Sequence, residues 1–168
     1  MNAVYEGEEA PNGESISAAG YDANNGVVYG LEASGKLYRY SGFNSQGKLT
    51  GRTQVATVAG ADGINEMAFN NADGQLYAIS GAANLMTVDV NTGAVTEIGQ
   101  FGSGVVAMDF DSNGTLWIVD LYGALCSVNL NTGSVTQVAE TGISALAGQN
   151  FYNQSGCLFE NTLSLIHI

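Results

Sequence analysis

Short apolar runs alternate with turns rich in Gly, Asn and Asp along most of this chain. Between residues 64 and 98, β-branched and aromatic residues fill four such runs, whereas the turns hold residues that tolerate left-handed backbone angles. This alternation predicts strands at 64–69, 75–79, 85–90 and 94–98. The four strands follow one another so closely that no helix fits between them.

The same series of strands returns further along the chain. The segments Gly74-Gln-Leu-Tyr and Asn91-Thr-Gly reappear as Gly114-Thr-Leu-Trp and Asn131-Thr-Gly. A repeat of about forty residues with four short strands is typical of a β-propeller blade. We therefore predict an all-β fold of β-propeller blades with four antiparallel strands each. About three and a half blades are present, so this chain does not close the ring.

An earlier copy of the repeat is longer by a stretch around residues 42–49, which we expect to extend the hairpin between its third and fourth strands. A fourth copy begins near Gly156 but lacks its third and fourth strands. The predicted blades span residues 15–62, 63–102 and 103–142, followed by an incomplete blade at 143–162.

The two ends of the chain differ from the repeats. Residues 1–14 are predicted to be a disordered acidic lead-in. Residues 163–168 resemble the peptide encoded by sequencing-adapter DNA, so we expect a non-native tail on a truncated chain. An open ring leaves an apolar blade face at each end, and we therefore expect the remaining blades of a parent protein, or self-association, to cover these faces.

The chain carries 16 acidic and 4 basic residues, with a net charge of −12. Such a surface repels phosphate groups, so nucleic acids and anionic membranes are unsuitable partners. The charge is explained either by solubility, as in secreted bacterial proteins, or by cation binding. No apolar run is long enough to span a membrane, and the start of the chain does not resemble a signal peptide. We expect an extracellular or cell-surface location without membrane insertion.

One turn resembles the beginning of a calcium-binding loop. Asp109, Asp111 and Asn113 precede Gly114 at alternate positions, and Asp120 follows where such a loop places its last acid. Closely spaced oxygen atoms suit a hard cation. However, the flanking segments are predicted strands rather than helices, so a plain hairpin turn is the alternative. We predict no cofactor other than calcium at this turn.

Catalysis by a nucleophile is difficult to assemble because the only histidine, His167, lies in the suspected tail. Carboxylate chemistry remains open. Glu66 and Asp109 lie on equivalent inner strands with the same side-chain parity, and such strands line the central channel of a propeller. Both are candidate ligand-binding residues, and the alternative is that they are solvated acids of the channel.

Aromatic residues recur at one position of every copy, which predicts packing between blades, although stacking on a carbohydrate is an alternative reading. These residues are Tyr29, Tyr77, Trp117 and Phe159.

The combination of Asn-Gly or Asp-Gly, then Leu-Tyr or Leu-Trp, then Asn-Thr-Gly resembles the quinoprotein-like and YVTN-like propeller repeats of bacteria, from residue 16 to about 159. The quinoprotein blade usually has a tryptophan after its Thr-Gly turn, where this chain has Glu97 and Gln137. The resemblance implies an architecture rather than a reaction.

Three functions follow from these observations. The first is a non-catalytic binding or scaffolding segment of a secreted or surface-exposed bacterial propeller protein, with a protein or glycan ligand. The second is a fragment of a lactonase-type or glycan-lyase-type propeller enzyme that uses channel carboxylates and a divalent cation. The third is a purely structural repeat array.

Overall fold

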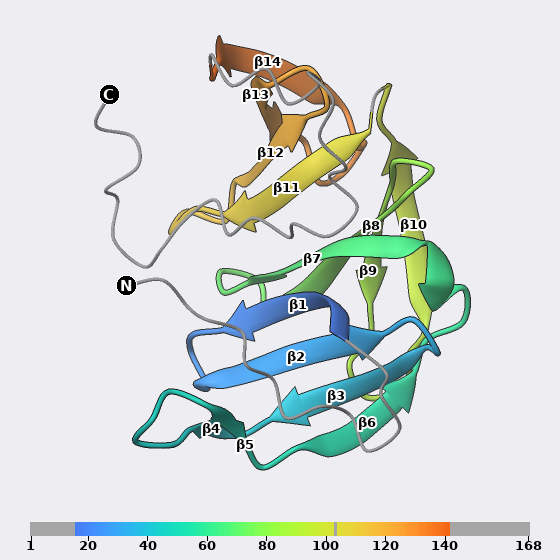
Figure 1. Cartoon of the computed structure of the whole chain (residues 1–168). Coiled ribbons are helices and arrows are strands. Elements are labelled where there is room, and N and C mark those ends of the chain that lie inside the picture. The colour runs from blue at the N-terminus through green and yellow to red at the C-terminus, as the bar shows by residue number, and fades with distance from the viewer. Residues whose placement is uncertain (1–15, 103, 142–168) are drawn as a thin grey trace.

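The computed structural model describes residues 16–102 and 104–141, which form three four-stranded antiparallel sheets (Figure 1). Each sheet is a blade in which consecutive strands pair. The first blade consists of β1 (Ile16–Asp22), β2 (Val27–Glu32), β3 (Lys36–Tyr40) and β6 (Thr53–Thr57). The second consists of β7 (Ile64–Asn70), β8 (Gln75–Ser80), β9 (Asn84–Val88) and β10 (Val95–Gln100), and the third of β11 (Val105–Phe110), β12 (Leu116–Asp120), β13 (Ala124–Val128) and β14 (Val135–Glu140).

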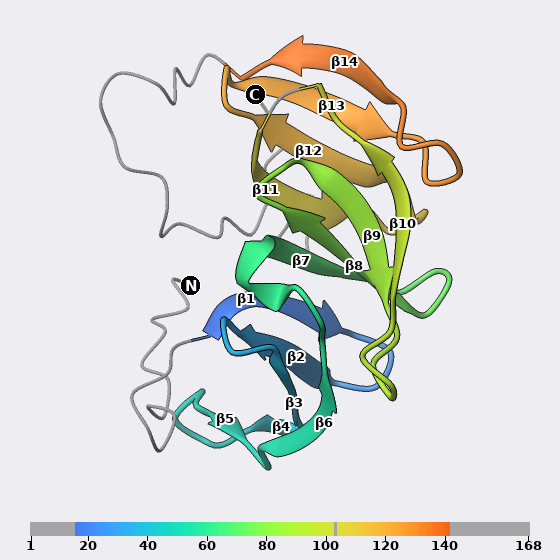
Figure 2. The same ribbon diagram turned by 90° about the vertical axis from the view of Figure 1, so that its right-hand side faces the viewer.

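The predicted all-β blade architecture is therefore confirmed. Within the described residues the only helical element is η1 (Ala61–Gly63), a single 3-10 turn that joins the first two blades. The inner strand of the second blade, β7, lies between the inner strands β1 and β11 of its neighbours (Figure 2). The three blades thus follow one another around an axis without closing a ring.

The third strand of the second blade is shorter than predicted. It ends at Val88 rather than at residue 90, because Asp89 already begins the turn. Its Oδ1 accepts hydrogen bonds from the backbone N–H groups of Asn91 (2.8 Å) and Thr92 (3.3 Å), and its carbonyl oxygen accepts one from Gly93. An aspartate that bonds to the backbone two residues further on favours a turn over a continued strand.

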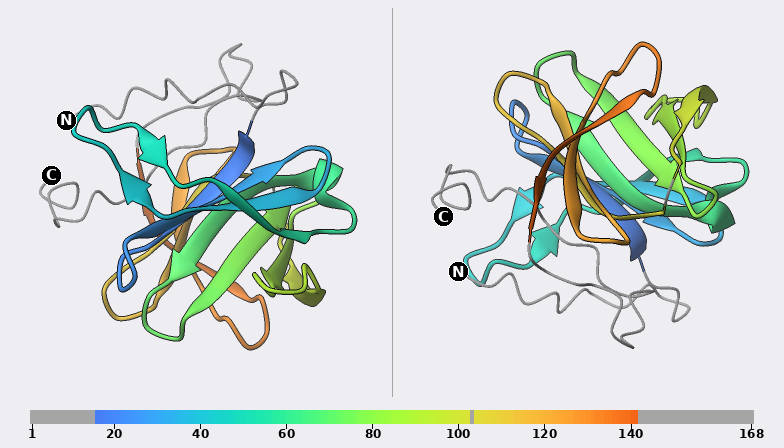
Figure 3. Two further views of the ribbon diagram at one scale, coloured as in Figure 1. Left: turned by 90° about the horizontal axis from the view of Figure 1, so that it is seen from below. Right: turned by 90° about the horizontal axis from the view of Figure 1, so that it is seen from above.

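The additional residues of the first blade form the expected hairpin extension. Strands β4 (Gly42–Phe43) and β5 (Leu49–Thr50) pair with each other and project from the edge of the blade (Figure 3). Asn44 shapes the tip of this hairpin, because its Oδ1 accepts hydrogen bonds from the N–H groups of Gln46 and Lys48, both at 2.9 Å. The insertion leaves the order of the four strands of the blade unchanged.

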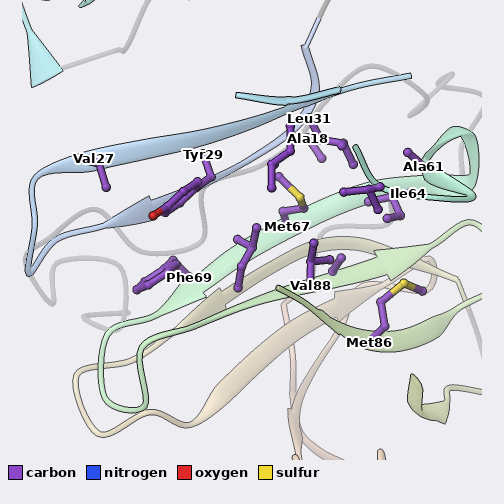
Figure 4. Packing of buried hydrophobic residues seen from close by; sticks show 14 residues of the cluster. Ala18, Val27, Tyr29, Leu31, Ala61, Ile64, Met67, Phe69, Met86 and Val88 are labelled. Atoms are coloured by element: carbon purple, nitrogen blue, oxygen red, sulfur yellow. The ribbon is translucent and has the colours of Figure 1, made fainter. Parts of the chain in front are cut away.

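The hydrophobic core lies between blades rather than within one. In the first cluster, side chains of β2 and β3 meet side chains of β7, β8 and β9 (Figure 4). Tyr29 of the first blade stacks on Phe69 of the second, with ring centroids 5.7 Å apart and 16° between the ring planes. The predicted role of the recurring aromatic position in blade packing is confirmed here.

The second cluster repeats this arrangement between the second and third blades. Tyr77 packs on Phe110 with a centroid distance of 5.0 Å, and the pair sits among fully buried aliphatic residues such as Leu85 and Leu116. Cys126 is buried in this cluster as a small apolar residue. Each interface therefore combines an aromatic pair with an aliphatic layer, which is the usual source of stability in repeat proteins.

Turns also connect successive blades. The Oδ1 atom of Asn71, in the turn between β7 and β8, accepts a hydrogen bond of 2.7 Å from the N–H of Ala23 in the corresponding turn of the first blade. The side chain of Asn24 donates to the carbonyl oxygen of Asn71 at 2.8 Å. The polar turns are thus part of the blade interface at one end of the sheets.

Several predictions fall on residues outside the described ranges. They concern the acidic lead-in at 1–14, the incomplete blade at 143–162 and the tail at 163–168, and with them Phe159 and His167.

Candidate functional site

The three inner strands share a β-bulge at the same place. The register between the first and second strand of each blade shifts between Ile16 and Ala18, between Ile64 and Glu66, and between Val105 and Ala107. A bulge re-aims the side chain that follows it, and bulges are frequent at the rims of barrels and beside binding sites. The residue after this bulge is therefore the natural place to look for a functional side chain.

Glu66 occupies this place in the second blade, where the other two blades have alanine. Ala18 pairs with Leu31, Glu66 with Ile79, and Ala107 with Val119. Because side chains that pair across strands share a face, Glu66 lies on the side of β7 that is turned toward the third blade, where Ile79 and Ala68 enter the second cluster. The second blade therefore has a carboxyl group at the position where the first and third blades have the methyl group of an alanine.

The environment of Glu66 favours its neutral form. The residue is only 7% exposed, and no hydrogen bond to its side chain occurs within the described residues. Burial raises the pKa of Glu66 to about 8. The carboxyl group is consequently protonated at neutral pH, so it can both donate and accept a hydrogen bond.

Asp109, the second predicted channel residue, does not share this environment. It pairs with Trp117, as Ala68 pairs with Tyr77. Its neighbours Met108 and Phe110 point into the second cluster, so the alternation of side chains directs Asp109 to the opposite face of the third blade. The structure thus places Glu66 and Asp109 on corresponding faces of successive blades and does not bring them into one site.

The side chain of Asp111 accepts hydrogen bonds from residues in and next to its own turn. Its Oδ1 accepts hydrogen bonds from the N–H groups of Asn113 and Thr115, both at 2.9 Å, and its Oδ2 accepts one of 3.1 Å from Nε1 of Trp117. Burial alone would raise the pKa of Asp111, but the hydrogen bonds from Trp117, Thr115 and Asn113 together lower it below its usual range. The carboxylate is therefore charged and largely engaged with protein donors.

The remaining calcium candidates are distributed over the blade. Asn113 lies in the same turn as Asp111, whereas Asp120 lies at the far end of β12. Oδ1 of Asp120 accepts hydrogen bonds from the N–H groups of Tyr122 and Ala124, both at 2.9 Å, in the next turn. In residues 16–102 and 104–141, no three His, Cys, Asp or Glu residues come together in a way that could hold a metal ion. Calcium binding at Asp109, Asp111, Asn113 and Asp120 stays a prediction.

One charged cluster was not foreseen from the sequence. Glu32, at the end of β2, is fully buried and forms an ion pair with Arg52. The Ser34 hydroxyl donates to the same carboxylate at 3.1 Å, and the Arg52 guanidinium lies 3.7 Å from the ring centroid of Tyr38. Two signals pointed to this cluster: all four basic residues fall in the first blade, and the second blade has Ser80 where the first has Glu32.

This cluster lies on the outward face of the first blade. Glu32 is adjacent in sequence to Leu31, which points into the first cluster, and so it faces away from the second blade. At the positions of Tyr38 and Tyr40 the second blade has Met86 and Val88, both of which face the first blade. The outward face of the first blade is thus more polar than the equivalent faces of the second and third blades.

Comparisons with known proteins agree with this architecture. A family model described as a domain of unknown function, DUF4394, matches residues 41–116. No curated protein sequence matches the chain.

None of the helical segments in the described part of the chain is long and apolar enough to cross a membrane.

Solved structures resemble the chain at low sequence identity. The nidogen/laminin complex contains a chain that is similar with a TM-score of 0.60 and 12% identity, over 77% of this chain and 50% of that one. A protein of unknown function from Bacteroides thetaiotaomicron has a TM-score of 0.55 and 16% identity, over 74% and 35% of the two chains. The C-terminal WD40 domain of Sif2 has a TM-score of 0.51 and 11% identity, over 76% and 37%.

These likenesses concern the fold alone. WD40 domains are β-propellers, so the agreement of the three sheets with such a domain supports the blade assignment. The chain spans between 35% and 50% of the length of these three structures. It is a segment of β-propeller architecture whose chemistry must be argued from its own residues.

Proposed function

We propose that this chain is a non-catalytic binding segment of a larger β-propeller protein, with Glu66 as its principal ligand contact. The proposal rests on the observation that the second blade has Glu66 at a position where the first and third blades have alanine. Positions required for packing recur from blade to blade, as do Tyr29, Tyr77 and Trp117. A buried carboxyl group in place of an alanine lowers stability when it ionises, and groups with such a cost are concentrated at functional sites.

The chemistry of the group indicates the class of ligand. A neutral carboxyl group recognises an uncharged polar group by donating one hydrogen bond and accepting another. Hydroxyl groups of a glycan and amide groups of a protein loop both fit this requirement. The net charge of −12 disfavours nucleic acid as a partner. We further propose a secreted or surface-exposed bacterial parent protein of the quinoprotein-like or YVTN-like kind, with no cofactor and at most weak binding of calcium.

Binding to a glycan array, followed by isothermal titration with each glycan that binds, tests this function. Glu66→Gln keeps the size of the side chain and removes only its ability to ionise and donate through an acid O–H. Glu97→Gln, on the exposed face of β10, is the matched control. The proposal expects weaker binding of the Glu66→Gln variant and unchanged binding of the control. Equal affinity of the parent and both variants would show that Glu66 does not contact the ligand.

A second candidate function is supported by the same carboxyl group. A pKa of about 8 makes Glu66 a suitable general acid at neutral pH. An enzyme of the lactonase or glycan-lyase type would then combine it with a divalent cation. Turnover of a lactone or a polysaccharide by the parent protein, lost in Glu66→Gln and dependent on calcium, would favour this function over simple binding. Binding without turnover would favour the first.

A further inference from the structure

The two described blade interfaces each contain an aromatic pair at the same position. Tyr29 of the first blade packs on Phe69 of the second, and Tyr77 of the second blade packs on Phe110 of the third. Phe69 and Phe110 both lie near the end of an inner strand, on the face turned toward the preceding blade. The second and third blades therefore each receive an aromatic ring from the preceding blade at this position.

Tyr21 occupies the same position in the first blade. It pairs with Val28 across β1 and β2, as Phe69 pairs with Leu76 across β7 and β8. Tyr29, the neighbour of Val28, points into the first cluster, so Val28 and Tyr21 lie on the outward face of the first blade. In the part of the chain that the structure describes, no sheet of another blade packs on this face.

The inserted hairpin places an aromatic ring on Tyr21. Phe43 of β4 contacts Tyr21 edge to face, with ring centroids 6.4 Å apart and 64° between the ring planes. This distance lies, like those of the other two pairs, within the range of about 4.5–7 Å in which aromatic rings attract each other. The first blade thus supplies from its own insertion the ring that the second and third blades receive from a neighbour.

Backbone hydrogen bonds hold the hairpin on both sides of Phe43. At its base, the N–H of Ser41 donates to the carbonyl oxygen of Thr50 at 2.9 Å. Near its tip, the N–H of Asn44 donates to the carbonyl oxygen of Lys48, also at 2.9 Å. Phe43 therefore projects from a hydrogen-bonded strand pair rather than from an irregular loop.

The insertion is attached to the outward face at a second place. Arg52, where the chain returns to β6, forms its ion pair with Glu32 and lies over the ring of Tyr38. Both partners lie on the same outward face as Tyr21. The insertion consequently contacts this face shortly before β4 ends and again after β5 ends.

We propose that the hairpin of β4 and β5 is a cap that occupies the outward face of the first blade in place of a preceding blade. The cap and a further blade exclude each other, because each places an aromatic ring on Tyr21. Tyr21 is 43% exposed, compared with 7% for Phe69 and 8% for Phe110. A hairpin thus shields this position less than a blade does, and a second copy of the chain packs here only when the hairpin is displaced.

Exchange of the insertion removes the cap and leaves the strands of the blade in place. In the exchange variant, residues 89–94 of the second blade, which form the short turn at the equivalent position, replace residues 41–51, so that Arg52 is kept. Phe43→Ala is the smaller change, and Lys48→Ala, at the exposed tip, is the control. Sedimentation velocity measures self-association of each full chain over a range of protein concentrations.

Both uncapped proteins should self-associate about tenfold more tightly than the parent and the control, because one aromatic pair gained at a contact corresponds to about this factor. Adding Tyr21→Ala to the exchange variant should abolish the gain. Equal self-association of the parent, Phe43→Ala and the exchange variant would overturn the proposal, since the hairpin would then block nothing.

Urea denaturation tests the contact between the two rings independently of association. The double variant of Tyr21→Ala with Phe43→Ala should lower the urea midpoint by clearly less than the sum of the single shifts. Additive shifts would show that the rings do not meet in solution, which would also overturn the proposal. Neither ring belongs to the two core clusters, so each variant should keep a cooperative melting transition by circular dichroism.

Discussion

Gly93 lies so close to Thr57 of the preceding blade that a Cβ atom on Gly93 would be 2.2 Å from the Thr57 carbonyl oxygen. The same contact recurs one blade later, where a Cβ atom on Gly133 would be 2.9 Å from Cα of Gly99. The repeated Asn-Thr-Gly turn is therefore a contact between blades as well as a reversal of the chain. Its glycine is required by the close approach of a neighbouring backbone, in addition to its positive φ.

Replacing Gly93 by alanine should separate these two requirements. Gly93 and Gly74 have almost the same φ, 75° and 76°, but no atom lies within 4 Å of a Cβ on Gly74. Gly74→Ala should cost about 1 kcal/mol of unfolding free energy from backbone strain alone. Gly93→Ala should cost at least about 2 kcal/mol more than Gly74→Ala, because the backbone at Thr57 must move away from the new Cβ atom. Urea denaturation of both variants measures the difference, and equal losses would show that the turn does not support the interface.

The buried carboxyl group of Glu66 makes stability depend on pH. Its pKa rises from 4.5 in the unfolded chain to about 8 in the folded protein, so the folded state binds the proton more tightly. Ionisation of Glu66 therefore favours unfolding, and its effect grows as pH rises from about 4.5 to about 8. The loss across this window should be about 3–5 kcal/mol, since each unit of pKa shift corresponds to about 1.4 kcal/mol.

Glu66→Gln should remove this part of the pH dependence. The variant should unfold at higher urea concentration than the parent at pH 8.5 or so, where the parent carries a buried charge, and close to the parent at about pH 4. Glu97→Gln, on an exposed strand, should leave the pH profile of the parent unchanged. A parent protein whose stability is equally high at both pH values would show that Glu66 is solvated in the folded state.

The sequence predicts the blades because their signals are local. Alternation of apolar residues locates the strands, and Gly, Asn and Asp mark the turns, so β7 and β8 begin where expected. The apolar pattern predicts that β9 continues to Val90, whereas the strand ends at Val88 because the side chain of Asp89 bonds to the turn. Hydrogen bonds to the Asp89 side chain set the boundary, and composition does not encode them.

The sites are less predictable because they depend on the relation between blades. Alternation along the strands predicts the same side-chain parity for Glu66 and Asp109, but only the stacking of blades shows that β11 lies between their side chains. The pairing of Glu32 with Arg52 joins residues from different strands across Tyr38. Alignment of repeats marks Glu32 as unusual but does not identify its partner, because the inserted hairpin that precedes Arg52 has no counterpart in the other blades.

The ion pair of Glu32 and Arg52 should be costly to break from either side. Arg52→Met removes the cation that pairs with the buried carboxylate of Glu32, which should cost about 3–5 kcal/mol of unfolding free energy. The double variant Glu32→Gln with Arg52→Met should lose clearly less than the sum of the single losses, because both charges of the ion pair are then removed together. Lys48→Met, at the exposed tip of the inserted hairpin, should stay within about 0.5 kcal/mol of the parent. Additive losses would place the two side chains apart in solution.

Asp111 should stabilise its turn whether or not calcium is present. Asp111→Ala removes the acceptor of three hydrogen bonds, from Asn113, Thr115 and Trp117, and should cost about 1–3 kcal/mol at neutral pH. Because folding lowers the pKa of Asp111, this contribution is present above the pKa of the unfolded chain and is lost as pH falls through that of the folded protein.

Calcium distinguishes the structural role of Asp111 from a metal site. We expect calcium to bind the parent weakly at most, since three protein donors already engage the carboxylate and Asp120 lies at the other end of β12. Melting of the parent and of Asp111→Ala should therefore differ by the same amount in excess calcium and in chelator. A difference that appears only with calcium, together with tight binding of calcium by the parent in isothermal titration, would establish the turn as a calcium site. Asp89→Ala, in an exposed turn of the second blade, controls for the loss of a turn aspartate alone.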